Sequence, residues 1–178
     1  MNYPTQYETD FLTKDNKKIL VRPLKTPDEQ LLRDLYYSLD DRDIYLRFCQ
    51  VGRNSCLEAA QEESNIDYHN KFCIGALVGE SSHQEMIGTA GYFLNPNTNT
   101  AEYSFVVKKS WRNCGIGQFL LNHLVDIAKE KGIKGFYGTI HLENKNTIHI
   151  FKKFWNIKIT PPEIGEKELF FEVFFENE

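Results

Sequence analysis

A glycine pair stands directly before the most regular amphipathic segment of the chain. The six residues from Arg112 to Gly117 read Arg-Asn-Cys-Gly-Ile-Gly, and apolar residues then recur at helical spacing. Glycine lets the backbone come close to a ligand, and the first amides of a helix have no carbonyl partner within it, so they can bind an anion. The segment therefore predicts either a site for a phosphate-containing ligand or a tight turn that packs a helix closely on a strand.

The flanking residues exclude the two commonest phosphate-binding loops. No Gly-Lys-Ser/Thr sequence follows the glycines, and position 120, where a dinucleotide fingerprint has its third glycine, is Leu120. We therefore expect neither a nucleoside triphosphate nor a dinucleotide.

The wider pattern resembles the GNAT superfamily of N-acetyltransferases. It consists of a strand from Ala101 to Val107, four spacer residues, the Arg-x-x-Gly-x-Gly loop, a helix, a strand, and Glu143-Asn144 before another helix. The stretch from Ala101 to Phe154 aligns without gaps to the acetyl-CoA-binding pattern of that family. A second stretch, from Asp43 to Phe48, is similar to the first-helix region of bacterial protein-lysine acetyltransferases.

The resemblance implies one GNAT-type domain over residues 1–178, of the α/β (α+β) class. Its mixed, mostly antiparallel sheet of about seven strands is expected to carry helices on both faces and to splay at the cofactor site. Acetyl-CoA is the implied co-substrate, with its pyrophosphate on the loop amides and its pantetheine arm beside the strand and Asn144. For Asn144, helix capping is the alternative. The implied cofactor-binding residues are Phe105, Val106, Val107, Arg112, Asn113, Cys114, Gly115, Ile116, Gly117, Gln118, Asn144 and Phe151.

Glu102 is the residue that the resemblance places as general base. An alkylammonium group with a pKa near 10.4 must lose its proton before it can attack a thioester, and a carboxylate can accept that proton directly or through water. The alternative is a solvated carboxylate on a strand. A backbone N–H at the end of the strand, near Val107, would bind the oxyanion.

Three residues depart from the family pattern. Phe151 occupies the position of the usual tyrosine general acid, so Tyr137 or water would have to supply that proton. Asn113 replaces a common glycine, but asparagine adopts positive φ readily. Cys114 replaces a basic or polar residue; we expect it to contribute its backbone, and an acetyl-cysteine intermediate is the less favoured alternative.

The acceptor site is expected to involve Tyr45, Arg47 and Tyr92, although core packing is the alternative for the two aromatic residues. The predicted activity is direct transfer, in a ternary complex, of an acetyl group from acetyl-CoA to a primary amine of a protein lysine or a small molecule. Two other classes stay open. One is a non-catalytic acyl-CoA sensor or interaction module, and the other is a scaffold without a ligand.

Hydrophobic periodicity and turn residues predict the elements that hold this site. The first part should form a hairpin around the polar turn 14–17, a helix capped by Thr26, and a second short helix holding Ile44. The last strand, which is apolar on both sides, is expected to be covered on both faces. The remaining predicted elements are a strand meander over 71–78, 86–94 and 100–107, a helix over 115–131, a strand over 136–142, a helix over 146–154 and a strand over 170–175.

Composition limits the possible partners. The chain has 178 residues and is 41% hydrophobic, which suits one globular core. Its 21 basic and 25 acidic residues give a net charge of −4, so nucleic acid is not expected as a partner. The four cysteines and five histidines lack metal-ligand spacing, and no metal is predicted. Without a long apolar segment or signal sequence, the chain is predicted to be cytoplasmic and not membrane-bound.

Overall fold

A computed structural model describes residues 2–48, 54–80, 83–154 and 157–175. These ranges form one eight-stranded sheet in the order β1-β2-β3-β4-β5-β6-β8-β7. Every neighbouring pair of strands is antiparallel except β5 and β6, which are parallel. The mixed, mostly antiparallel sheet is confirmed, with one strand more than the expected count of about seven. The strands are β1 (Thr9–Leu12), β2 (Lys18–Pro23), β3 (Lys71–Val78), β4 (Glu85–Asn95), β5 (Thr100–Val107), β6 (Gly135–His141), β7 (Lys158–Thr160) and β8 (Glu168–Phe174).

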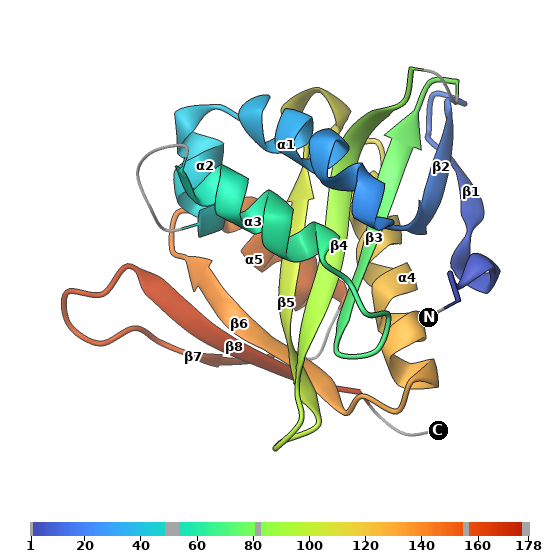
Figure 1. Cartoon of the computed structure of the whole chain (residues 1–178). Coiled ribbons are helices and arrows are strands. Elements are labelled where there is room, and N and C mark those ends of the chain that lie inside the picture. The colour runs from blue at the N-terminus through green and yellow to red at the C-terminus, as the bar shows by residue number, and fades with distance from the viewer. Residues whose placement is uncertain (1, 49–53, 81–82, 155–156, 176–178) are drawn as a thin grey trace.

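Helices cover both faces of the sheet, as expected (Figure 1). The first three, α1 (Glu29–Tyr37), α2 (Asp41–Phe48) and α3 (Asn54–Ser64), lie on one face, and α4 (Ile116–Glu130) and α5 (Lys145–Phe154) lie on the other. The sequence did not predict α3. Its buried apolar residues, Cys56 and Ala60, are small, so the helix lacks the stripe of large side chains that marks an amphipathic helix.

The longest helix, α4, is formed as its sequence predicts. Its apolar stripe, which includes Leu120, Leu124 and Ile127, is buried against the sheet. Each such side chain contributes about 1.5–3 kcal/mol when it is fully buried. Gly132, at a φ of +75°, donates to the Lys129 carbonyl, and Ile133 donates to Ala128. These two bonds form a Schellman motif, which ends the helix where the glycine predicts.

The first helix is capped differently from the prediction. The N-cap of the turn that leads into α1 is Lys25 and not Thr26, and the side chain of Asp28 accepts the Lys25 N–H at 2.7 Å. The same buried carboxylate forms a bidentate ion pair with Arg22, at 2.6 and 2.9 Å. The buried pair therefore ties the start of α1 to β2, a contact that local capping patterns do not reveal.

The expectation that the last strand is covered on both faces is wrong. Burial alternates along β8, with Leu169, Phe171 and Val173 in the core, whereas Phe170 and Phe174 are 37% and 59% exposed. The apolar run therefore covers the core with one face only. In the described ranges, no helix combines the length and the apolar character needed to cross a membrane.

Candidate functional site

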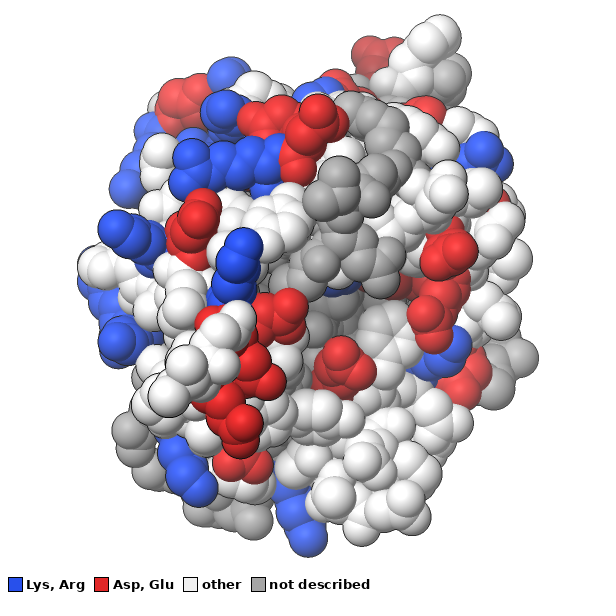
Figure 2. All heavy atoms as spheres, turned by 90° about the vertical axis from the view of Figure 1, so that its left-hand side faces the viewer, with Lys and Arg blue, Asp and Glu red and all other residues white. Residues whose placement is uncertain are grey.

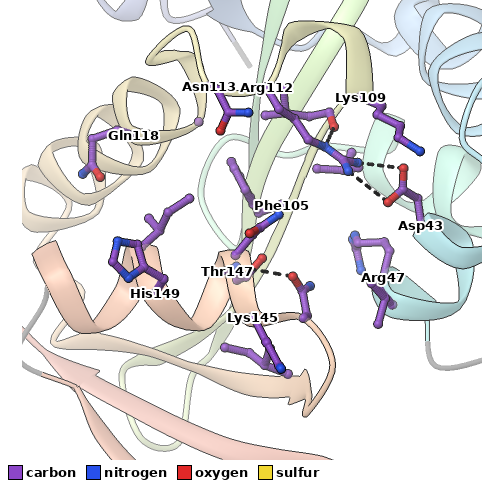
Figure 3. A pocket seen from close by; sticks show the side chains of 18 of the residues that line it. Asp43, Arg47, Phe105, Lys109, Arg112, Asn113, Gln118, Lys145, Thr147 and His149 are labelled. Carbon is purple, nitrogen blue, oxygen red and sulfur yellow. Dashed lines mark hydrogen bonds and ion pairs between the residues drawn. The ribbon is translucent and has the colours of Figure 1, made fainter.

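The two parallel strands part at the centre of the sheet. β5 and β6 pair only at Ala101–Phe136 and Glu102–Tyr137, although β5 continues to Val107. A cleft of about 840 Å³ occupies the gap and extends over the start of α4 (Figure 3). Most of the predicted cofactor-binding residues line it, namely Phe105, Val106, Val107, Arg112, Asn113, Gly115, Gly117, Gln118 and Asn144.

The backbone of β5 offers unused hydrogen-bonding groups to this cleft. The Lys108 N–H donates to Ile87 of β4, and successive residues of a strand turn their peptide groups to opposite edges. The N–H and C=O groups of Phe105 and Val107 therefore point toward the gap that β6 leaves open. The Val107 carbonyl accepts a 3.0 Å bond from Arg112 Nε, which leaves the two N–H groups facing the cleft.

The loop before α4 forms an anion cradle. Asn113 and Gly115 adopt φ values of 65° and 95°, which turn the chain sharply into the helix. The first bond of α4 runs from Phe119 N–H to the Gly115 carbonyl, so the amides of residues 116–118 have no carbonyl partner within the helix. A Cβ atom on Gly117 would lie 3.1 Å from the Phe105 ring, which shows how closely the loop packs on β5. The positive end of the helix dipole adds to this preference for an anion.

Two predicted loop residues turn their side chains away from the cleft. Ile116 is buried in the core, and Cys114 Sγ donates to the Trp111 carbonyl at 2.8 Å. They can reach a ligand only through their backbone. The geometry gives no support to the alternative of an acetylated Cys114.

Arg112 lies at the cleft but is engaged with protein groups. Its guanidinium forms a bidentate pair with Asp43 of α2, at 3.1 and 2.8 Å, in addition to its bond to Val107 (Figure 3). The Arg112 side chain is 31% exposed and that of Asp43 is 12% exposed. Arg112 therefore connects α2 to the end of β5, and this contact differs from the predicted cofactor-binding role.

Asn144 performs the capping role that was its alternative interpretation. Its Oδ1 accepts the Thr147 N–H at 3.3 Å at the start of α5. Because Asn144 also lines the cleft, its amide nitrogen remains able to donate to a ligand. Capping and ligand binding are compatible here.

The prediction that Phe151 contacts the cofactor is wrong. Its side chain is fully buried, with its ring centroid 5.1 Å from that of Tyr103 and 4.9 Å from that of Phe171. Phe151 therefore belongs to the core between α5 and the sheet. Tyr103 does line the cleft, and burial raises the pKa of its phenol, so this hydroxyl stays neutral.

Glu102 lies at the point where β5 and β6 part. It is opposite Phe93 of β4 and Tyr137 of β6, and its side chain is exposed. Its neighbour Ala101 packs in the core beneath α4, so Glu102 points to the other face of the sheet. Glu102 does not line the 840 Å³ cleft but lies beside its inner end, on the side of α2 and α3.

The predicted acceptor residues have different positions. Arg47 lines the cleft and pairs with Glu63 of α3 at 2.8 Å, whereas Tyr45 bonds His141 at 3.2 Å. Tyr92 is completely buried and stacks on Phe72, with ring centroids 5.8 Å apart. The prediction that Tyr92 reaches the acceptor cleft is therefore wrong, because its side chain faces the core beneath α4.

Several other cleft residues, among them Asp43, Ser104 and Lys14, were not assigned a role from the sequence. Asp43 lines the cleft from α2 and Ser104 lines it from β5, and Lys14 reaches it from the β1–β2 turn. Ser104 Oγ is buried and has no hydrogen-bond partner among the described residues. No local pattern identifies Lys14, since only the packing of the hairpin against the α4 loop brings this residue to the cleft.

Known proteins share this architecture. The model of the acetyltransferase (GNAT) family matches residues 39–155. An acetyltransferase of Pseudomonas aeruginosa is 22% identical over 131 residues, which cover 74% of this chain and 70% of that protein.

Solved structures agree with that match. The GNAT domain of S. lividans PAT superposes with a TM-score of 0.85 at 21% identity, covering 98% of this chain and all of that one. The PaiA N-acetyltransferase of Thermoplasma acidophilum, solved in complex with coenzyme A, gives 0.66 at 18% identity, with 88% and 99% covered. Because the family model spans more than half of the described fold and includes the loop and both parted strands, the chain belongs to the acetyltransferase (GNAT) family.

Proposed function

We propose that this acyltransferase-family protein is an N-acetyltransferase that moves an acetyl group from acetyl-CoA to a primary amine. The observation that carries the proposal is the continuity of one cleft with two chemically different ends. One end presents the free amides at the start of α4, and the other is the gap between β5 and β6. Coenzyme A has the same order of groups, a pyrophosphate followed by an extended amide-containing arm.

The residues at each end fit the corresponding part of the ligand. The amides of residues 116–118 would donate to the pyrophosphate oxygens, which carry negative charge. Along the gap, one of the N–H groups of Phe105 and Val107, together with the side-chain amide of Asn144, would bond the pantetheine arm, and the other N–H would face the thioester. The volume of about 840 Å³ lies in the range of roughly 300–1,000 Å³ that ligand pockets occupy.

Glu102 is proposed as the general base. At about 3.3 Å per residue, the three residues from Glu102 to Phe105 span about 10 Å, so a water molecule between carboxylate and amine suits the geometry better than direct contact. The amine lone pair attacks the thioester carbonyl once its proton has passed to Glu102. The N–H of Phe105 or Val107 donates to the resulting oxyanion.

Collapse of that adduct breaks the C–S bond and releases a thiolate, while the nitrogen gives its second proton to water and becomes the amide nitrogen. Because Phe151 has no hydroxyl and is buried, water is the proposed proton source for the sulfur. A thiol with a pKa near 8.5 is a sufficiently stable leaving group for this step. Direct transfer in a ternary complex also agrees with the position of Cys114 Sγ, which faces Trp111 and not the cleft.

The acceptor is proposed to be a cationic primary amine, either a protein lysine or a small molecule. Figure 2 shows Asp and Glu side chains near the middle of the face on the α2 and β6 side, with many Lys and Arg side chains toward its upper left. Acidic groups of this kind attract an ammonium ion to this face of the molecule.

A non-catalytic acyl-CoA-binding module is the second candidate. The missing hydroxyl at Phe151 favours it, and it predicts ligand binding without release of thiol. A scaffold without any ligand predicts no binding at all.

Calorimetric titration with acetyl-CoA and with CoA tests the cofactor site. Asn113→Asp and Asn113→Gly form a matched pair, because both residues accept the positive φ of this exposed position and only Asp adds a negative charge. We expect Asn113→Gly to bind as the wild type does and Asn113→Asp to bind roughly tenfold more weakly, since a carboxylate repels the pyrophosphate. Absence of binding by the wild type would refute the assignment.

Release of free thiol during turnover, followed over a panel of amines, separates the enzyme from the binding module. Glu102→Gln should lower turnover by about 10²- to 10⁴-fold and leave the affinity for acetyl-CoA unchanged. Glu80→Gln, at an exposed position beyond the end of β3, serves as the charge-matched control. An unchanged rate in Glu102→Gln would remove Glu102 from the mechanism.

A further inference from the structure

The tip of the β1–β2 hairpin lies against the anion cradle. Phe11 of β1 stacks on Phe119 of α4, with ring centroids 4.6 Å apart, and is 3.4 Å from the Cβ position of Gly115. Lys17 lies over the ring of Trp111, 5.1 Å from its centroid. In Figure 1 the hairpin tip and the first turn of α4 are at the same end of the molecule. These contacts fix the tip beside the loop that begins α4.

The conformation of the tip is held by its own hydrogen bonds. The buried Thr13 exchanges backbone bonds with Lys17 and Asn16, each at 3.0 Å, and its hydroxyl oxygen accepts the Lys17 N–H at 2.9 Å. The same hydroxyl donates to Asp15. Asn16 takes the positive φ that this tight turn requires. Lys14 is therefore carried on an ordered turn, which lowers the entropy lost when its ammonium group binds a ligand.

Among the described residues, Lys14 and Lys145 are the lysines of the cleft that form no ion pair, and Lys14 is the one on the hairpin beside the cradle. Lys109 pairs with Asp40 at 3.1 Å, Lys17 pairs with Asp15 at 2.8 Å, and Arg112 pairs with Asp43. Among the described residues, no carboxylate lies within ion-pair distance of Lys14, and its side chain lines the cleft. An exposed, unpaired ammonium group beside an anion cradle favours a second anionic group of the same ligand.

We propose that Lys14 binds the 3′-phosphate of coenzyme A and makes the protein select CoA over dephospho-CoA. The inference rests on the proposed function, because it assumes that the cradle holds the pyrophosphate. The amides of residues 116–118 account for the pyrophosphate, and the pantetheine arm is uncharged. The 3′-phosphate is the remaining anion of the ligand, and Lys14 lines the cleft from the hairpin that packs against the cradle, so it would lie near the adenosine end.

Calorimetric titration with CoA and with dephospho-CoA tests this proposal on the wild type, Lys14→Met and Lys18→Met. Lys18 is on the same hairpin but pairs with Asp10 outside the cleft, so its variant removes an equal charge from the same element. We expect the wild type to bind CoA about tenfold more tightly than dephospho-CoA. Lys14→Met should lose that preference by weakening CoA alone, whereas Lys18→Met should keep it.

The outcomes separate the two proposals. Equal affinity of the wild type for both ligands, or equal weakening of both ligands by Lys14→Met, would overturn the role of Lys14 and leave the cofactor site intact. Failure of the wild type to bind either ligand would overturn the proposed function together with this inference.

Discussion

Replacing Arg112 by lysine should weaken the fold and the chemistry more than it weakens cofactor binding. Lysine keeps the positive charge but lacks the planar fork, so it can replace only one of the three bonds to Val107 and Asp43. The lost bonds are one to a neutral carbonyl, which is worth about 0.5–1.5 kcal/mol, and one to a carboxylate, which is worth about 1.5–3 kcal/mol. Their sum is roughly 2–4.5 kcal/mol.

Solvent reduces this cost, because the Arg112 side chain is 31% exposed. We therefore expect a loss near the lower limit, about 2 kcal/mol of unfolding free energy, or a fall in Tm of about 4–8 °C for a chain of this size. The Val107 amide would also be held less firmly, so kcat should fall several-fold. The affinity for CoA should stay within about twofold of the wild type, since the anion is held by backbone amides.

Urea unfolding of Arg112→Lys, Asp43→Asn and the double variant measures the coupling between the two side chains. We expect a coupling energy of about 1–2 kcal/mol, together with similar kcat losses in the two single variants. A tenfold loss of CoA affinity in Arg112→Lys, with unchanged stability and a normal Asp43→Asn variant, would refute the reasoning. Arg112 would then bind phosphate, as the sequence pattern implies.

Three further predictions follow from other contacts. Glu63→Gln should lower the free energy of unfolding by about 3 kcal/mol in urea, because it leaves Arg47 without its ion-pair partner. Adding Arg47→Met should recover most of that loss. If the double variant recovers no stability, the unpaired Arg47 is not the cause. The pKa of Asp67 is lowered to about 2, since its hydrogen bonds from the amides of residues 69–71 outweigh the opposing effect of burial. Its unfolded pKa is near 3.9, so its stabilisation is present above pH 4 and disappears as the pH falls from about 4 to 2. After discounting for solvent, Asp67→Asn should cost about 1 kcal/mol at pH 7 and almost nothing at pH 2, as measured by unfolding at both pH values. Cys114→Ser should retain acetyl-CoA binding and turnover within about twofold of the wild type. A serine hydroxyl can also donate to the Trp111 carbonyl that the thiol contacts. An inactive variant that still binds acetyl-CoA would point to a covalent intermediate.

Features determined by neighbouring residues could be predicted from the sequence. The start and end of α4 follow from Gly115 and Gly132, whose positive φ values are local properties, and the apolar stripe between them fixes its buried face. The amide cradle depends on the same short segment. The amides at the start of α4 therefore follow from the short segment itself, whereas the choice between a phosphate site and a tight turn rested on the wider resemblance from Ala101 to Phe154.

Features determined by contacts across the fold could not be predicted. Asp43 and Arg112 are 69 residues apart, so their ion pair exists only after α2 has packed beside the end of β5. Phe151 and Tyr92 were assigned to the site, but burial depends on which face of the helix or strand meets the core. The role of Lys14 likewise requires the position of a hairpin 100 residues before the loop.

The pairing between β5 and β6, in the centre of the sheet, is much shorter than the pairing between β4 and β5. Two residue pairs join the five-stranded half to the three-stranded half, whereas β4 and β5 share eight pairs. The amide hydrogens of Phe105 and Val107 therefore lie in the middle of the sheet yet face an open gap. In hydrogen–deuterium exchange they should behave like those of an edge strand, losing their protons early in the free protein and becoming slow when a ligand fills the gap. The interior of this sheet thus contains an edge that a bound molecule can complete.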